Sequence, residues 1–259
     1  MKKIEEPIAN LDEAIKLLKK NHSFRNPKFD NFRDNKEVVS IALKKDVRSF
    51  KYISDRLKAD EEIISMAVSI TPDTLQYVPK ELLANSDFIE SMGEITSHNA
   101  HCYWGLIVME FASPELKNNK ELAMNLAELR GYGIQYLSDE LKQDKELALK
   151  AIKTECIALE KLPHFQNDKE FVLTAVESSV GTIRVGFEYA STELKGDRDF
   201  VLEVCRIDHR SIQFACDELK NLCGDKNPVK AIEAQIFAEK LQRELSNKEE
   251  LKPTRKMKI

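Results

Sequence analysis

The segment Asp168–Val176 reads DKEFVLTAV, and the segment Tyr189–Lys195 reads YASTELK. In the first segment, an aspartate is followed at +3, +4, +7 and +8 by apolar residues, a spacing that places all four on one face of an α-helix. Asp168 stands where the side chain of an N-cap residue accepts a hydrogen bond from the first turn. In the second segment, an aromatic residue precedes a leucine by five positions. These two half-motifs decide the fold because both recur along the chain.

The recurrence has a fixed register. The residues that start the helical half are Asn35, Asp60, Asn85, Asn119, Asp144, Asp168 and Asp197. The second half recurs as Tyr52–Leu57, Tyr77–Leu82, Phe111–Leu116, Tyr136–Leu141, Tyr189–Leu194 and Phe214–Leu219. A helix pair this short cannot bury its own apolar face, so neighbouring pairs must stack. The sequence therefore predicts an all-α fold, a solenoid of about seven short helix-turn-helix repeats with a period of about 25 residues. We expect the second helix of each repeat to carry the aromatic residue and the leucine on one side, packed in the core.

The two ends depart from the repeat. Residues 1–34 are predicted to form an N-terminal capping region with a degenerate repeat, because Asn10 lies one period before Asn35. Residues 35–221 form the repeat array. Asn227-Pro228 opens a longer helix, so residues 222–246 are predicted to be a C-terminal capping helix, since proline is favoured in the first helical turn. Residues 247–259 are predicted to be a polar tail.

The two half-motifs resemble a bacterial repeat family known as domain of unknown function forty-one-sixteen. The resemblance rests on Asp168–Val176 and Tyr189–Lys195, and equally on Asp197–Val204 and Gln213–Leu219. It covers about residues 35–221. It implies a helical-repeat fold and no catalytic residue, because the family has no agreed activity. Two repeats are lengthened, and the fifth has Lys161 in place of the aromatic, followed by Pro163, His164 and Phe165.

Composition restricts the function classes. The chain has 259 residues, a net charge of −4 and no strong basic cluster outside the tail, which disfavours nucleic acid as a partner. No apolar run has the length of a membrane span, and the first residues contain no apolar leader segment. Five cysteines at unrelated spacings do not indicate a disulfide framework. We expect a cytoplasmic protein that needs no cofactor and no metal.

One insertion is a candidate binding site. The third repeat is lengthened between Glu94 and Glu110, and the inserted stretch contains His98, His101, Cys102, Tyr103 and the single tryptophan, Trp104. Insertions in repeat proteins map to loops, and tryptophan and tyrosine are enriched in binding hot spots. His101, Tyr103 and Trp104 are therefore predicted to contact a partner. The alternative is that Trp104 begins an extended second helix and fills space. A zinc site or a cysteine nucleophile in this stretch has little support, because the spacing lacks a fourth ligand and a defined partner.

Acidic residues precede the leucines of several repeats, among them Glu81, Glu115, Glu140 and Glu193. In a stacked array they align along one edge, which predicts an acidic ridge that steers a basic partner. Charge of this kind is also typical of a plain solvated surface. Two further groups are predicted to be structural. Asp208-His209-Arg210 is predicted to form a turn, and Cys205 is predicted to be a small apolar residue of the core.

Three functions fit these features. The first is a protein-binding module, in a concrete version an immunity or antitoxin-like protein that caps a toxin, with a bacterial effector that binds a host protein as a variant. The second is an enzyme with a site between His98 and Trp104. The third is a nucleic-acid-binding helical repeat, which the acidic balance speaks against. We expect a non-enzymatic module whose partner is another protein.

Overall fold

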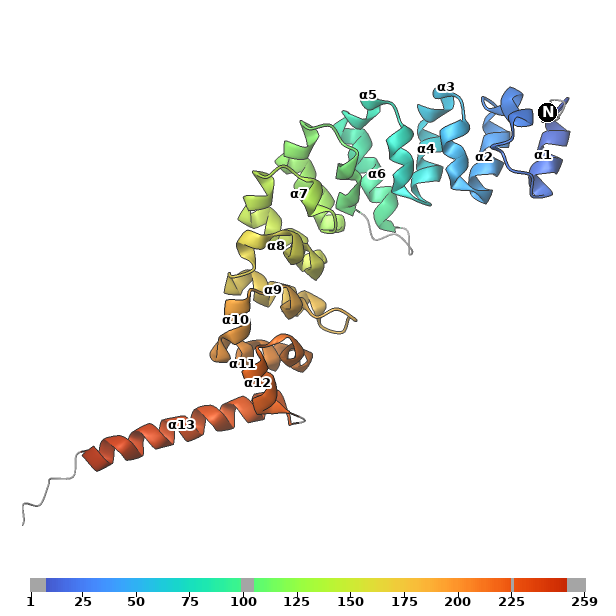
Figure 1. Cartoon of the computed structure of the whole chain (residues 1–259). Coiled ribbons are helices and arrows are strands. Elements are labelled where there is room, and N and C mark those ends of the chain that lie inside the picture. Colours follow the sequence, from blue (N-terminus) through green and yellow to red (C-terminus); the bar gives the residue numbers. More distant parts are fainter. Residues whose placement is uncertain (1–7, 99–104, 225, 251–259) are drawn as a thin grey trace, which may run out of the picture. The chain divides into compact units, whose positions relative to one another are not determined.

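The computed structural model describes residues 8–98, 105–224 and 226–250, and these residues form α-helices, 3₁₀ helices and connecting turns without a strand. The prediction of an all-α repeat solenoid is confirmed (Figure 1). The chain divides into two compact units, Met1–Lys161 and Leu162–Ile259.

One layer of the first unit consists of its longer helices. These are α1 (Leu11–Lys19), α2 (Lys36–Lys45), α4 (Glu61–Val68), α6 (Ser86–His98), α7 (Lys120–Leu129) and α8 (Lys145–Thr154). Consecutive members from α1 to α8 contact one another. Each is capped as predicted: the side chain of Asn10, Asn35, Asp60, Asn85, Asn119 or Asp144 accepts a hydrogen bond from the backbone N–H three residues later. The apolar residues at +3, +4, +7 and +8 are buried in α2, α4, α7 and α8.

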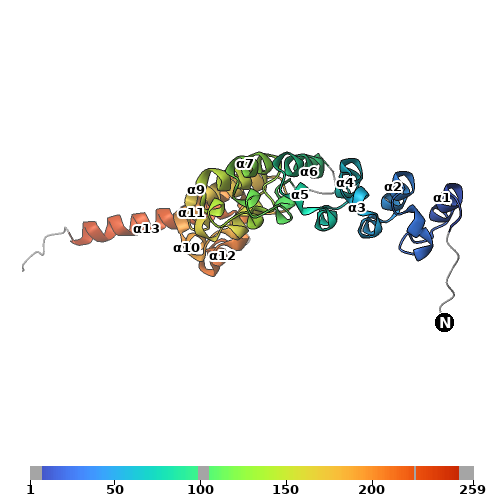
Figure 2. The same ribbon diagram turned by 90° about the horizontal axis from the view of Figure 1, so that it is seen from above.

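A second layer consists of 3₁₀ helices. These are η1 (Pro27–Phe32), η2 (Val47–Tyr52), η3 (Pro72–Tyr77), η4 (Gly105–Glu110), η6 (Ile134–Tyr136) and η8 (Cys156–Lys161). Each of η2, η3, η4 and η8 packs against the α-helix of its own repeat, and successive 3₁₀ helices from η2 to η8 contact each other. Figure 2 shows the helices of this unit from above, with the two layers side by side.

Short helices follow the 3₁₀ helices at one edge of the unit. They are α3 (Asp55–Lys58), α5 (Lys80–Leu83), η5 (Leu116–Asn118) and η7 (Leu141–Gln143). The prediction that one second helix carries both the aromatic residue and the leucine is therefore wrong, because the two residues belong to different elements. The chain is extended between them: Ile53 has φ −72° and ψ 167°, and Ser54 then caps α3 by accepting a hydrogen bond from Leu57 N–H.

A serine at the position of Ser54 joins several repeats to the ones before them. Ser54, Ser138 and Ser191 donate a backbone hydrogen bond to the preceding repeat, at Arg33, Lys117 and Gln166 respectively, over 2.8–3.0 Å. Their hydroxyls donate to the side-chain oxygens of Asp34, Asn118 and Asn167. We call this pair of bonds the serine clasp. Because the clasp joins defined positions of neighbouring repeats, it helps to fix the register of their stacking.

One type of ion pair recurs at three junctions between neighbouring long helices. The Lys36 ammonium lies 2.9 Å from the Asp60 carboxylate, Lys120 lies 2.7 Å from Asp144, and in the second unit Lys169 lies 2.7 Å from Asp197. In each pair the lysine follows the N-cap residue of one helix, and the aspartate is the N-cap residue of the next. The cap residues therefore bond their own helix and its neighbour at once.

The second unit repeats the pattern and ends in a long helix. Its elements are η9 (Pro163–Phe165), α9 (Lys169–Ser179), η10 (Gly186–Tyr189), α10 (Thr192–Gly196), α11 (Arg198–Ile207), η11 (His209–Phe214), α12 (Asp217–Cys223) and α13 (Pro228–Glu250). In η9, buried Phe165 occupies the leucine position and stacks on Phe171 with ring centroids 4.1 Å apart. The N-terminal part of α13 packs on α11 and α12, and Asn227 accepts a hydrogen bond from Lys230 N–H. The helix begins at Pro228, as predicted, but it extends to Glu250 and excludes residues 222–227 of the predicted range 222–246.

Two glycines permit the close approach of the layers. A Cβ atom on Gly131 would lie 2.1 Å from the carbonyl oxygen of Ala151, and one on Gly186 would lie 2.0 Å from that of Ala175. Neither distance is possible between non-bonded atoms. Glycine is therefore required where these segments meet α8 and α9.

Among the residues that the structure places, no helix is both long enough and apolar enough to cross a membrane.

Candidate partner-binding groove

The aromatic residues of the repeat motif lie at the surface. Tyr77 is 38% exposed, and Tyr52, Phe111 and Tyr136 are half-buried. The prediction that they pack in the core is therefore wrong. Each one ends or directly follows a 3₁₀ helix, and the residue after it turns inward instead: Ile53, Val78, Ala112 and Leu137 are buried. Successive 3₁₀ helices contact each other, so these four aromatic residues form a row on the surface of the first unit.

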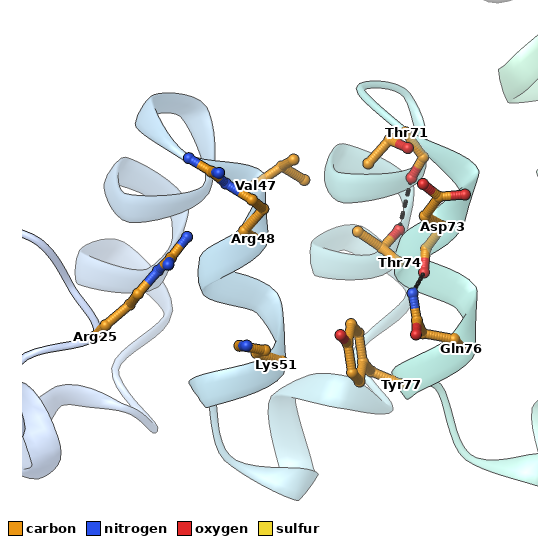
Figure 3. A pocket seen from close by; sticks show the side chains of 9 residues that line it. All are labelled: Arg25, Val47, Arg48, Lys51, Thr71, Asp73, Thr74, Gln76 and Tyr77. Carbon is orange, nitrogen blue, oxygen red and sulfur yellow. Dashed lines mark hydrogen bonds between the residues drawn. The ribbon is translucent and has the colours of Figure 1, made fainter.

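A groove of about 290 Å³ lies at the N-terminal end of this row, between η2 and η3. Arg25, Arg48 and Lys51 line one wall, and Thr71, Asp73, Thr74, Gln76 and Tyr77 line the other (Figure 3). Three cations thus face a wall of neutral polar groups with one carboxylate and one aromatic ring.

Asp46 holds the two arginines in place. Its carboxylate caps η2 by accepting a hydrogen bond from Arg48 N–H, and it lies 2.8 Å from Arg48 Nε and 3.1 Å from Arg25 Nη2. The hydrogen bond from Arg48 is the main reason why the pKa of Asp46 lies below its usual range. One carboxylate therefore orients two guanidinium groups, and the Arg48 side chain remains 75% exposed.

The third cation of the wall is Lys51, which lies against an aromatic face. Its Nζ is 4.9 Å from the centroid of the Tyr52 ring, a distance at which a cation is attracted by the ring. The ring of Tyr77, which lines the opposite wall, lies 6.5 Å from that of buried Phe50. Both tyrosines are thus anchored while part of each ring faces solvent.

The wall formed by η3 is ordered by local hydrogen bonds. Pro72 begins the 3₁₀ helix with a backbone angle already suited to it. Thr74 Oγ1 donates to the carbonyl of Thr71 over 2.9 Å, and Gln76 Nε2 donates to that of Asp73 over 2.7 Å (Figure 3). The polar side chains of this wall consequently have defined orientations.

A second hollow of about 240 Å³ adjoins the groove and shares Arg48 with it. It is lined by the turn His22–Phe24 together with Lys45, Asp46 and Ser49 among others. Arg48 therefore stands between two depressions. Together they extend across two successive repeat junctions, which is room for an extended segment of several residues rather than for a single small group.

The sequence interpretation missed this basic region. Residues 8–59 hold thirteen lysines and arginines against seven aspartates and glutamates, although the whole chain is acidic. This excess was the available signal. Guanidinium groups match carboxylate and phosphate oxygens in bidentate geometry, and a tyrosine ring adds apolar contact area. The groove can thus hold an acidic segment by its charged groups and an adjacent apolar side chain by Tyr77.

The predicted partner-binding residues have different outcomes. His101, Tyr103 and Trp104 lie outside the described residues. Glu193 lies on α10, and Glu115 and Glu140 directly precede η5 and η7; all three are exposed, and their role in binding a basic partner stays a prediction. Glu140 and Glu193 also accept hydrogen bonds from Asn118 and Asn167, over 3.3 and 2.9 Å, beside the serine clasp. These two glutamates therefore contribute to repeat stacking, a role that the sequence interpretation did not assign.

The remaining predicted groups are structural. The Asp208 carboxylate caps η11 and lies 2.7 Å from Arg210 Nη2, and the hydrogen bond from Arg210 is the main cause that lowers the pKa of Asp208. The interpretation of this turn is confirmed. Cys205 is buried in the core as predicted, and burial raises the pKa of its thiol to about 12. Among the described residues, no three histidine, cysteine, aspartate or glutamate side chains are placed to hold a metal ion.

Comparison with known proteins identifies the repeat. The family model described as Domain of unknown function (DUF4116) matches residues 14–58, 35–83, 100–142, 144–184 and 186–220. No curated protein and no solved structure matches the chain.

Proposed function

Because the chain belongs to the family described as Domain of unknown function (DUF4116), whose model matches it five times, we propose its function from the surface of its repeats: a protein-binding module that holds an acidic segment of its partner. The single observation that carries the proposal is the groove between η2 and η3, lined by Arg25, Arg48, Lys51 and Tyr77.

The shape and the charge of the region support a segment rather than a small molecule. The groove and the adjoining hollow are open depressions on either side of Arg48, and the row of half-exposed aromatic residues continues from Tyr77 to Phe111 and Tyr136. Aromatic residues and arginine are enriched among the residues that dominate binding energy at protein interfaces. A partner segment with carboxylates at one end and apolar side chains at the other fits this order of groups.

A finer version of the proposal is an immunity or antitoxin-like protein of the bacterial cytoplasm that caps a toxin, or an effector that binds a host protein. Its support is the charge of the middle of the chain, where residues 61–160 hold seventeen aspartates and glutamates against eight lysines and arginines. An acidic surface steers a basic partner toward the array. In this version the partner is basic overall and presents one acidic segment to the groove.

The test measures binding of a defined probe. A fluorescein-labelled 14-residue peptide of glutamate and aspartate with two tyrosines is titrated with the full chain, and its anisotropy is followed. The Arg48→Ala, Lys51→Ala variant is expected to bind about tenfold more weakly than the wild type, because it removes two of the three cations of the groove. Binding by the wild type is also expected to weaken as salt is raised.

The matched control is the Lys145→Ala, Lys153→Ala variant. It removes the same charge from exposed positions on α8 of the same unit, away from the groove. Its affinity is expected to stay within about twofold of the wild type. Equal losses in the two variants would mean that the peptide responds to net charge only, and a wild type that does not bind the peptide would exclude an acidic segment as the ligand.

A further inference from the structure

Helix α13 has one face packed in the second unit and an apolar stripe on the opposite face. Ile232 is fully buried and Ile236 is half-buried against the unit. On the same side, Arg198 donates to the Glu239 carboxylate over 2.7–2.8 Å, and Arg206 lies 2.7 Å from Glu233. These contacts fix which face of α13 is turned toward the unit.

The exposed stripe is formed by Phe237, Leu241 and Leu245, which are 70%, 48% and 54% exposed. They are spaced four residues apart, so they lie on one face and extend over about 12 Å of helix. Ala234 and Ala238 lie on the same side at helical spacing and are also exposed. Large apolar side chains in such a contiguous row are typical of an interaction surface.

We propose that α13 pairs with α13 of a second copy of this chain in antiparallel orientation, with Leu241 at the two-fold axis. The stripe is self-complementary about this residue. Leu241 of one copy meets Leu241 of the other, and Phe237 meets Leu245, because both lie four residues from the centre. The small side chains of Ala234 and Ala238 let the helices approach closely.

Charge along one border of the stripe selects the second copy over another apolar helix. Lys240 and Glu244 are exposed and border the stripe on the same side. In the antiparallel pair, Glu244 of one helix stands about one turn or less from Lys240 of the other, and the two-fold axis produces this contact twice. The two Lys240 side chains approach each other over a similar axial distance once, so attractive contacts along this border outnumber the repulsive one. Opposite charges that flank an apolar seam set partner choice and orientation in paired helices.

Light scattering coupled to size-exclusion chromatography tests the pairing on the full chain. The seam is short, so dimers are expected in the range of about 10–100 μM, as for small interfaces. Leu241→Glu sets two carboxylates against each other at the axis and is expected to abolish dimers over this range. Gln242→Glu adds the same charge one residue away, off the stripe, and is expected to change the dissociation constant by less than about threefold.

A charge exchange tests the identity of the partner. Lys240→Glu alone and Glu244→Lys alone are expected to weaken the dimer about threefold to tenfold, and the double exchange is expected to restore it, since only a second copy carries both groups. In a mixture of Phe237→Cys and Leu245→Cys chains, the antiparallel order predicts a disulfide between positions 237 and 245. A monomeric wild type at about 100 μM would overturn the proposal. So would a dimer that survives Leu241→Glu, or a double exchange that does not recover.

Discussion

Gly186 provides a sharp test of how tightly the layers pack. In Gly186→Ala the new Cβ atom would lie 2.0 Å from the carbonyl oxygen of Ala175, 2.2 Å from its carbonyl carbon and 2.6 Å from the amide nitrogen of Val176. Non-bonded carbon and oxygen atoms approach to about 3.3 Å, so η10 must move away from α9 by more than about 1 Å. All three obstructing atoms belong to the backbone of α9 and cannot rotate away.

The displacement has an estimated energy. Buried Phe187 follows Gly186 and packs near Phe200 with ring centroids 6.2 Å apart. If η10 shifts by about 1 Å, each contact that opens loses about a quarter to a half of its dispersion energy. Overpacking of a close-packed core costs about 1–3 kcal/mol, and a clash with helix backbone belongs at the upper end or beyond. We expect about 3 kcal/mol, which lowers the melting temperature of a unit of this size by about 12 °C or more.

The assay is thermal and urea unfolding followed by far-ultraviolet circular dichroism. The matched control is Gly196→Ala at the end of α10 in the same unit, where a Cβ atom meets nothing within 4 Å. This variant is expected to be unchanged or more stable by up to about 1 kcal/mol, because alanine restricts the unfolded chain. Equal stability of the two variants would refute the close approach of η10 and α9.

Two further predictions concern the bonds between and within repeats. Ser191→Ala removes the hydroxyl that donates to Asn167 over 2.5 Å and accepts from Leu194 N–H over 3.2 Å, so we expect a loss of about 1–2 kcal/mol in the free energy of unfolding. Thr174→Ala, whose hydroxyl bonds only the preceding turn of α9, is the control and should cost less than about 0.5 kcal/mol in urea titrations. The pKa of Asp208 in the folded state lies below its unfolded value of about 3.9. The Asp208 carboxylate therefore stabilises the folded state fully above the unfolded pKa, and this stabilisation is lost as the pH falls through the folded pKa. The stability difference between the wild type and Asp208→Asn should accordingly shrink between pH 7 and pH 3, and a difference independent of pH would contradict this role.

The helical half of each repeat could be predicted from the sequence because its signals are local. Asp168 and its equivalents cap helices, and the apolar residues at fixed spacing after them are buried. The second half could not be predicted in the same way. The register of Tyr52 and Leu57 is real, but an extended residue between them separates two elements and turns the aromatic residue outward. A serine three positions before Leu57, Leu116, Leu141 and Leu194 was the visible signal of that break.

The groove depends on contacts that no local pattern contains. Arg25, Arg48 and Tyr77 come from three successive parts of the array and meet only because neighbouring repeats stack. The apolar stripe on α13 could not be predicted from the sequence either. The helix has apolar residues on two sides, so the spacing does not show which side faces the solvent. Predictions from spacing therefore succeeded for the capped helices and their stacking, and failed where an extended residue, a contact between repeats or a solvent-facing surface decides the role of a side chain.

Pro79 has a consequence for the mechanical behaviour of the array. At the equivalent position, Ser54, Ser113, Ser138, Ser191 and Cys216 each donate a backbone hydrogen bond to the preceding repeat. Proline has no N–H group to donate, so the junction between the repeats that begin at Asn35 and Asp60 lacks this bond. The groove between η2 and η3 spans that same junction. When the array is pulled along its length, the two walls of the groove separate after one backbone hydrogen bond fewer has broken than at a junction that carries the serine. Widening the groove therefore breaks no backbone hydrogen bond at this position, whereas widening a junction that carries the serine breaks one.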